Sequence, residues 1–186
     1  MAKSKIAVIV GSTRGTRFAP TPAKWIAGLA AARDDIEVEV VDLLDYPMGF
    51  LGEERTTEAQ NETAERWKKK MREFDGYIFT VAEYNHAPTA VLKNAIDLGE
   101  WIQKPFGFVG YGGVGGARAV EHLRLIAVEM QAASVKTGVH ILFPEYLAVA
   151  KNEKQLSDYP HLADAATSML DQLVWWAKAL KAAREG

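Results

Sequence analysis

The chain has 186 residues, of which 48% are hydrophobic and 25% are charged, as expected for a globular protein with a substantial core. A formal net charge of −2 offers no basic field for nucleic acid, and no apolar run is long enough to predict a signal peptide or a membrane-spanning helix. Cysteine is absent, which excludes disulfides and thiol chemistry, and the four histidines show no metal-binding spacing. We therefore expect one cytoplasmic domain over residues 1–186 with no metal site.

The N-terminal half predicts three strands and two helices. Short, β-branched apolar runs at residues 5–12, 36–43 and 76–81 are typical of buried strands. A helix is expected to begin near Pro20 and Pro22, because proline is tolerated in the first turn of a helix. A second helix is expected over residues 57–74, where apolar side chains recur at helical spacing.

The C-terminal half continues this alternation. Its expected elements are a helix over about 88–98, a strand over 106–112, a helix over about 116–133, a strand over 138–143 and a last helix through 162–180. Five strands that alternate with helices predict an α/β fold, in which a parallel sheet is covered on both faces. Ligands of such sheets bind at the carboxyl ends of the strands, so the loops after the first, third and fourth strands are expected to form one site.

The loop after the first strand, GSTRGTR, combines small residues, hydroxyls and two arginines. Ser12 and Thr13 add hydrogen-bond donors at the start of a helix, where the helix dipole favours an anion. Arg14 and Arg17 add positive charge with the fork geometry that suits phosphate. The lysine of a P-loop is missing. The pattern therefore favours an anion site of another kind over an ordinary polar turn.

The loop after the fourth strand, GYGGVG, matches the dinucleotide pattern G-x-G-x-x-G. Two observations argue against that interpretation. The motif follows the fourth strand instead of the first, and Glu129, the acidic residue at the required distance, falls inside a helix. The segment indicates either a bare backbone surface for a flat ligand or a tight turn before a helix, and both interpretations stay open.

The loop after the third strand, AEYNHAP, brings polar and aromatic groups to the same edge. Its backbone N–H groups, together with Tyr84 and Asn85, are suited to hold a flat heteroaromatic ring. The alternatives are half-buried packing for Tyr84 and loop or cap hydrogen bonds for Glu83 and Asn85. His86 is expected to be an exposed loop residue more often than a catalyst.

With these loops in place, the chain resembles the NAD(P)H-dependent FMN reductase family. The resemblance rests on GSTRGTR from Gly11, EYNHAPTAVLKNAID from Glu83 and GYGGVGGARA from Gly110, and it extends to about residue 143. It implies a flavodoxin-like three-layer sandwich with a five-stranded parallel sheet of order 2-1-3-4-5. One departure is Ala82, where the family usually has proline; another is Arg17, where many members have serine.

The resemblance implies non-covalently bound FMN, with its phosphate on the first motif and its ring between the other two. The implied cofactor-binding residues are Ser12, Thr13, Arg14, Arg17, Phe18, Glu83, Tyr84, Asn85, His86, Gly112 and Gly113. No catalytic side chain is implied, because the ring itself carries the electrons. Arg118 is expected to form a structural or intersubunit ion pair.

The implied activity is a ping-pong transfer of two electrons from NADH or NADPH to FMN and on to a small-molecule acceptor, such as a quinone, an azo compound or a metal oxyanion. The alternatives are a flavodoxin-type electron carrier without reductase activity and a flavodoxin-like domain that binds no flavin. We also expect a homodimer or homotetramer. Four apolar residues would either cap the pocket of a partner or cover the chain's own core: Met48, Phe50, Leu51 and Trp101.

Overall fold

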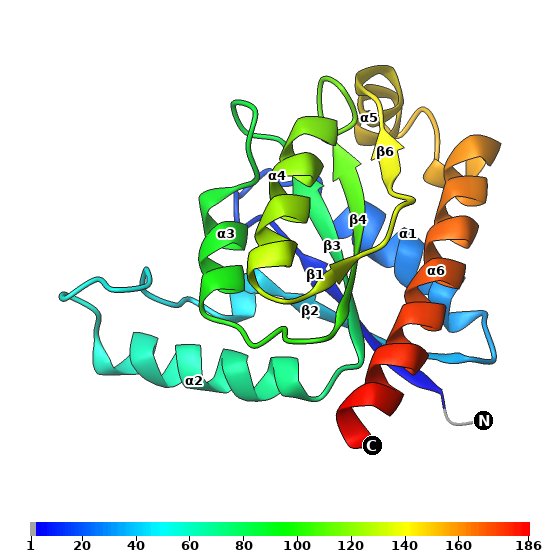
Figure 1. Cartoon of the computed structure of the whole chain (residues 1–186). Helices are drawn as coiled ribbons and strands as arrows, with labels where there is room; N and C mark the ends of the chain where they lie inside the picture. The colour runs from blue at the N-terminus through cyan, green and yellow to red at the C-terminus, as the bar shows by residue number, and fades with distance from the viewer. Residues whose placement is uncertain (1–2) are drawn as a thin grey trace.

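The computed structural model describes residues 3–186, and its centre is a parallel sheet (Figure 1). The strands are β1 (Ser4–Val10), β2 (Ile36–Asp42), β3 (Gly76–Ala82), β4 (Pro105–Tyr111), β5 (Ala133–Ser134) and β6 (Val139–Ile141). They are ordered β2-β1-β3-β4-β5, with β6 also paired to β4, and every pairing is parallel. The predicted order 2-1-3-4-5 is confirmed.

Helices cover both faces of this sheet. Their bounds are α1 (Pro20–Ala31), α2 (Glu58–Arg72), α3 (Ala90–Asp97), α4 (Ala117–Glu129), α5 (Phe143–Ala150) and α6 (Pro160–Glu185), with short 3-10 turns η1 (Leu43–Asp45) and η2 (Leu156–Asp158). Buried side chains of α1 and α6 belong to one core cluster, and those of α2, α3 and α4 belong to another. The result is the three-layer arrangement that a buried parallel sheet requires.

The outer end of the sheet differs from the sequence prediction. A single strand was expected over residues 138–143, but the edge is divided between β5 and β6. Between them, the carbonyls of Val135 and Lys136 accept hydrogen bonds from Arg124, at 2.5 and 2.8 Å, and the N–H of Thr137 donates to Gln172. Side chains therefore satisfy the backbone that a continuous strand would have paired. The predicted helix over 116–133 correspondingly ends at Glu129.

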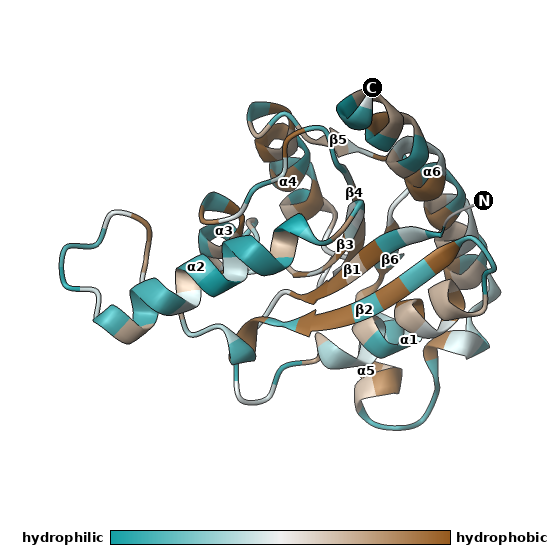
Figure 2. Ribbon diagram, turned by 90° about the horizontal axis from the view of Figure 1, so that it is seen from below, coloured by the Kyte–Doolittle hydropathy of each residue, from teal (hydrophilic) through white to brown (hydrophobic). Residues whose placement is uncertain are grey.

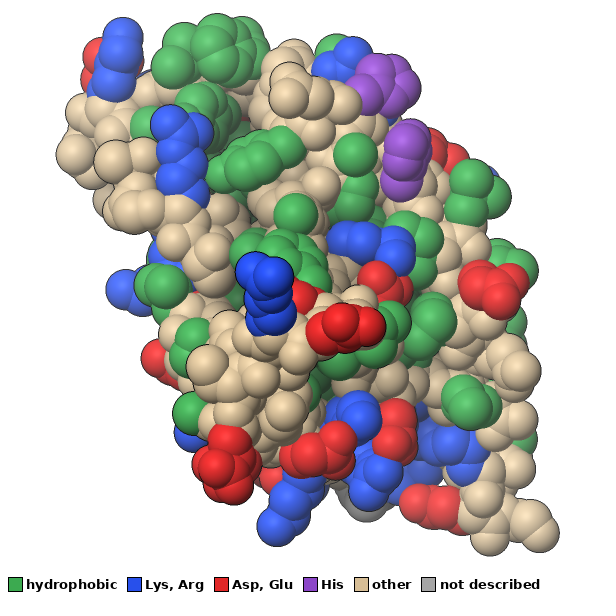
Figure 3. All heavy atoms as spheres, turned by 90° about the vertical axis from the view of Figure 1, so that its left-hand side faces the viewer, with side chains coloured by type: hydrophobic (Ala, Val, Ile, Leu, Met, Phe, Trp, Pro, Cys, Tyr) green, Lys and Arg blue, Asp and Glu red, His purple; other side chains and the backbone are tan. Residues whose placement is uncertain are grey.

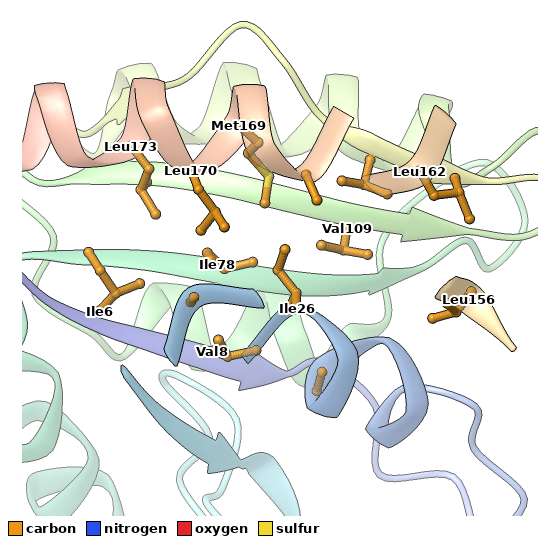
Figure 4. Close-up of a cluster of buried hydrophobic side chains, with 14 of the residues drawn as sticks. Ile6, Val8, Ile26, Ile78, Val109, Leu156, Leu162, Met169, Leu170 and Leu173 are labelled. Carbon is orange, nitrogen blue, oxygen red and sulfur yellow. The ribbon is translucent and has the colours of Figure 1, made fainter. Parts of the chain in front are cut away.

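One core cluster lies between the sheet and the helices α1 and α6. Met169 and Leu173 of α6 are fully buried, and they face Ile78 and Val109 of the two central strands (Figure 4). Burial of each such side chain stabilises the fold by about 1.5–3 kcal/mol. These contacts hold β3 and β4 rigidly, so the loops at their carboxyl ends have fixed starting points.

The four apolar residues considered for a partner's pocket have different environments. Trp101 is fully buried, and its Nε1 donates to the carbonyl of Ile96 at 2.6 Å, so it belongs to its own core. The expectation that Trp101 caps a partner is therefore wrong. Met48 is half-buried, whereas Phe50 and Leu51 are 56% and 62% exposed. Met48, Phe50 and Leu51 lie in the loop before α2. This loop extends away from the sheet in both ribbon views (Figures 1 and 2).

Candidate FMN-binding cleft

The loops after β1, β3 and β4 meet at the carboxyl edge of the sheet and line a cleft of about 390 Å³. The predicted residues that line it are Ser12, Arg14, Arg17, Phe18, Glu83, Tyr84, Asn85, Gly112 and Gly113. Thr13 and His86 lie outside this lining. Thr13 instead borders a smaller apolar pocket beside the loop, together with Tyr46 and Val91. The topology of the sheet thus brings together the three segments that the sequence separates.

The first loop is fixed where it leaves β1. The N–H of Gly11 donates to the hydroxyl of Thr80 at 3.0 Å, and the carbonyl of Gly11 accepts from the hydroxyl of Thr89 at 2.7 Å. A Cβ at position 11 would lie 2.2 Å from the carbonyl oxygen of Thr80, so only glycine fits there. These contacts place the next residue, the buried Ser12, at the wall of the cleft.

The two arginines of this loop differ in their partners. Arg17 donates to both carboxylate oxygens of Asp42, each at 2.6 Å, and to the carbonyl of Ser12 at 2.8 Å. Its charge is therefore balanced, and it holds the loop in shape. Arg14 is exposed and forms no ion pair within residues 3–186. Arg14 is thus the arginine whose charge remains available to an anion in the cleft.

The backbone of this loop also offers donors. The N–H groups of Thr13, Gly15 and Thr16 have no acceptor within the described part of the chain. They precede α1, whose N-terminus carries partial positive charge. Of these three residues only Thr16 lines the cleft, and its N–H, the helix N-terminus and the guanidinium of Arg14 are donors suited to a phosphate.

The loop after β3 forms a two-residue hairpin turn. Tyr84 and Ala87 exchange backbone hydrogen bonds of 2.8 and 3.1 Å, while Asn85 and His86 between them have φ values of 49° and 79°. Two successive positive φ angles are typical of a type I′ turn. The turn leaves Tyr84 42% exposed and brings the ring of His86 within 6.0 Å of the ring of His122. His86 consequently lies beside α4 instead of lining the cleft.

Glu83 forms an ion pair that connects two walls of the cleft. Its side chain is only 3% exposed, and its Oε1 accepts from Nε of Arg118 at 2.6 Å. Its Oε2 accepts from the backbone N–H of Arg118 at 3.2 Å, and Nη2 of Arg118 also contacts the carboxylate. Because Arg118 lies in the first turn of α4, the pair joins the β3 loop to the glycine loop. The expected ion pair of Arg118 is thus found within the chain.

The glycine loop combines both interpretations of its motif. Gly116 has a φ of 69°, and a Cβ there would lie 2.7 Å from the backbone nitrogen of Tyr111, so this end is a tight turn. Gly112 also has a positive φ, of 144°. Gly113 differs, since a Cβ there would meet no atom within 4 Å although the residue lines the cleft. The missing side chain at Gly113 therefore leaves open space at the wall of the cleft.

An aromatic wall completes the cleft, and the sequence interpretation missed most of it. Tyr146 stacks near Tyr111 and Phe143, with ring centroids 6.3 and 6.1 Å apart, and Phe18 meets Tyr146 edge-on at 4.8 Å. Burial raises the pKa of Tyr111, so its phenol stays protonated. Phe143 and Tyr146 belong to α5, which the sequence did not predict. The sequence was interpreted as a strand over GVHILF, residues 138–143, and no element was predicted for the PEYLAVA that follows.

This geometry fits the cofactor that the motifs implied. Ser12, Arg14 and Thr16 line the cleft together with Gly112 and Gly113 and the aromatic side chains of Tyr111, Phe143 and Tyr146. A flat ring needs such uncluttered backbone together with aromatic or apolar cover. No group of three or more potential metal ligands occurs in residues 3–186. The donor set of the cleft is therefore suited to a phosphorylated flat ligand.

The fold and the cleft together define a flavodoxin-like protein with a site of mononucleotide size. The profile of the family described as NADPH-dependent FMN reductase matches residues 4–143. The chain therefore belongs to this family, which confirms the predicted family and its class of FMN- and NAD(P)H-dependent oxidoreductases. Residues beyond 143, including most of α5, lie outside the matched region.

Relatives with assigned names agree with this membership. The chain is 35% identical over 133 residues to an NAD(P)H-dependent FMN reductase of Schizosaccharomyces pombe, an alignment that covers 66% of this chain and 65% of that protein. It is 31% identical over 128 residues to a quinone reductase of Pseudomonas putida, covering 64% and 67%. It is 27% identical over 139 residues to an FMN-dependent NADPH-azoreductase of Staphylococcus saprophyticus, covering 71% and 73%.

Solved structures agree on the fold. The NAD(P)H:(acceptor) oxidoreductase FerB of Paracoccus denitrificans superposes with a TM-score of 0.69 at 21% identity, covering 95% of this chain and 98% of that one. At this level of identity the likeness shows the fold, which is flavodoxin-like as predicted. Within residues 3–186, none of the helices combines the length and apolarity needed to cross a membrane.

Filling the open space at Gly113 is expected to block the cleft without disturbing the fold. In Gly113→Leu the new side chain would meet no neighbouring atom at its Cβ and would project beside the cleft. We expect FMN binding, measured by fluorescence titration, to be lost while the melting temperature changes little. Gly113→Ala is the matched control and should retain binding. FMN affinity unchanged in Gly113→Leu would contradict the assignment of this wall.

Proposed function

We propose that this chain holds FMN in the cleft and transfers two electrons from NAD(P)H to a small-molecule acceptor such as a quinone or an azo compound. The observation that carries the proposal is the cleft itself, which joins phosphate donors to a wall without side chains at Gly113. The names of the quinone and azo reductase relatives support the acceptor class. Bound FMN would supply the two-electron centre that these side chains lack.

The role of the side chains in this proposal is to bind and orient. Ser12 and Arg14 hold the phosphate together with the free N–H groups of their loop, while Arg17 keeps that loop in shape through Asp42. Gly112 lets the backbone approach the ring closely. No side chain needs to act as an acid or a base. Catalysis in this scheme consists of positioning and of electrostatic stabilisation of reduced FMN.

The nicotinamide and the acceptor are proposed to use the same open side of the cleft in turn. A cleft of about 390 Å³ that already holds a mononucleotide leaves no enclosed space for both of them together. Steady-state rates measured over a grid of NAD(P)H and quinone concentrations should therefore give parallel double-reciprocal lines. Intersecting lines would mean that both substrates bind at once.

One experiment tests the proposal against its alternatives. The purified protein is loaded with FMN, and NADH and NADPH oxidation are followed with a quinone and without any partner protein. An electron carrier would hold FMN but oxidise neither nucleotide, and a domain without flavin would stay colourless. Carriers meet their partners through faces of one charge. The chain instead has a net charge of only −2, and the face drawn in Figure 3 mixes basic and acidic side chains.

A homodimer or homotetramer is part of the proposal, as is a cytoplasmic location. Leu125 and Val128 on α4 are 75% and 74% exposed, on the helix that also carries Arg118 of the cleft. Burial of this face against a second copy would remove its apolar surface from water. Light scattering coupled to size exclusion measures the mass directly. A monomer at micromolar concentration would overturn this part of the proposal.

A further inference from the structure

A second hollow is lined by residues that follow those of the cleft closely in the sequence. This groove, which we call the α1–η2 groove, has a volume of about 430 Å³. It is bordered by Thr21, Lys24 and Trp25 of α1 and by the segment that joins α5 to η2. Helix α1 packs directly against η2, and α5 lies beside α1 in Figure 2. The two sides of the groove are therefore fixed elements of the fold.

The groove and the cleft share both of their walls. On one side, Phe18 lines the cleft and Thr21 lines the groove, three residues further on. On the other side, Tyr146 lines the cleft and Val149, one helical turn later on α5, lines the groove. At a rise of about 1.5 Å per residue, Tyr146 and Val149 are roughly 4.5 Å apart along α5, so the two hollows are neighbours. An extended ligand held in the groove can therefore reach the open side of the cleft.

The chemistry of the groove suits a phosphorylated nucleoside. Lys24 and Lys154 are both exposed, and neither forms an ion pair within residues 3–186. Lysine binds phosphate as a compact point charge. Trp25 offers part of its ring, and Gln155 offers an amide. Of the neighbouring acidic side chains, Asp158 accepts from the N–H of Gln155 at 2.8 Å, and Glu153 is exposed to solvent.

We propose that the α1–η2 groove binds the 2′-phosphorylated adenosine half of NADPH, with Lys24 and Lys154 on the 2′-phosphate. The proposal rests on the proposed function, since it assumes that the nicotinamide half reaches the cleft. It deepens that function because it makes NADPH the preferred hydride donor over NADH, which differs by this one phosphate. The part of the groove after α5 lies beyond residues 4–143, so the family profile does not include it.

The first test uses a fragment of the donor and needs neither FMN nor turnover. Adenosine 2′,5′-bisphosphate and adenosine 5′-diphosphate are titrated into the protein by calorimetry. We expect the 2′-phosphorylated compound to bind at least tenfold more tightly. The double variant Lys24→Gln with Lys154→Gln should abolish this preference. The matched control is Lys69→Gln, an exposed lysine of α2 on a different side of the molecule, which should retain it. Equal affinity of wild type and double variant would overturn the proposal.

The second test is kinetic and separates the two proposals. The double lysine variant should raise the KM for NADPH at least tenfold and leave the KM for NADH within twofold, with kcat unchanged for both. If the wild-type protein binds FMN and oxidises NADH and NADPH with equal KM values, the groove assignment is wrong but the proposed function stands. A protein that binds the bisphosphate in the groove but oxidises neither nucleotide would instead sink the proposed function.

Discussion

Replacing Arg118 by glutamine is expected to lower the reduction potential of bound FMN by about 30 mV or more, which corresponds to a tenfold loss of affinity for the reduced form relative to the oxidised form. The carboxylate of Glu83 lines the cleft with its side chain only 3% exposed, and Arg118 balances its charge. Reduced FMN gains negative charge, so an unbalanced carboxylate beside it would oppose reduction. We therefore expect Arg118 to position Glu83 and to offset its charge in the site.

The matched variants separate charge from structure. Glu83→Gln leaves Arg118 without its partner and should raise the potential, while the double variant should return it close to the wild-type value. Arg72→Gln removes an ion pair with Glu100 on the surface, far from the cleft, and should leave the potential unchanged. The potential is measured by equilibration with a reference dye. If Arg118→Gln weakened the binding of oxidised and reduced FMN equally, the pair would be only a structural link between β3 and α4.

The sequence predicted those elements of the fold whose type follows from the local pattern of apolar residues. The runs that became β1, β3 and β4 are short, apolar and β-branched, and a parallel sheet then forces their loops to one edge. The last strand was extended to Phe143 and α5 was missed, because after Pro144 and Glu145 the helix offers only the short apolar run YLAVA. Such a run fits a strand or a helix equally well by periodicity. The packing of Tyr146 against Phe18 and Tyr111 favours the helix, and these are tertiary contacts that the local sequence does not show.

Within the site, motif membership predicted which loops meet but not which side chain faces the ligand. His86 belongs to the same motif as Tyr84, yet two successive positive φ angles carry it toward His122. The pairing of Glu83 with Arg118 joins residues that are 35 positions apart in the chain. Ion pairs between distant segments leave no periodic signal in one sequence. The partner of Arg118 and the aromatic contacts of Tyr146 are therefore features of the site that only the structure supplies.

Arg14→Ala is expected to weaken FMN binding about tenfold, the lower end of the 1.5–3 kcal/mol typical of a charge-assisted hydrogen bond, because Arg14 is exposed to solvent. Arg17→Ala should weaken FMN binding more, although Asp42 already balances the charge of Arg17 and leaves none of it for the phosphate. Its loss releases the carbonyl of Ser12 and leaves Asp42 as an unbalanced carboxylate beside the phosphate loop. Fluorescence titration of FMN measures both effects.

Loss of Arg17 changes both the shape of the loop and the charge of Asp42. Adding Asp42→Asn to Arg17→Ala separates these two causes of weaker FMN binding. If charge dominates, removal of the carboxylate should restore much of the FMN affinity, although the hydrogen bonds of Arg17 remain absent. If the shape of the loop dominates, affinity should stay low, since the contact between Arg17 and Ser12 is still missing. Wild-type affinity in both Arg14→Ala and Arg17→Ala would sink the phosphate assignment. A loss confined to Arg14→Ala would show that Asp42 stays screened by water and that only Arg14 senses the anion.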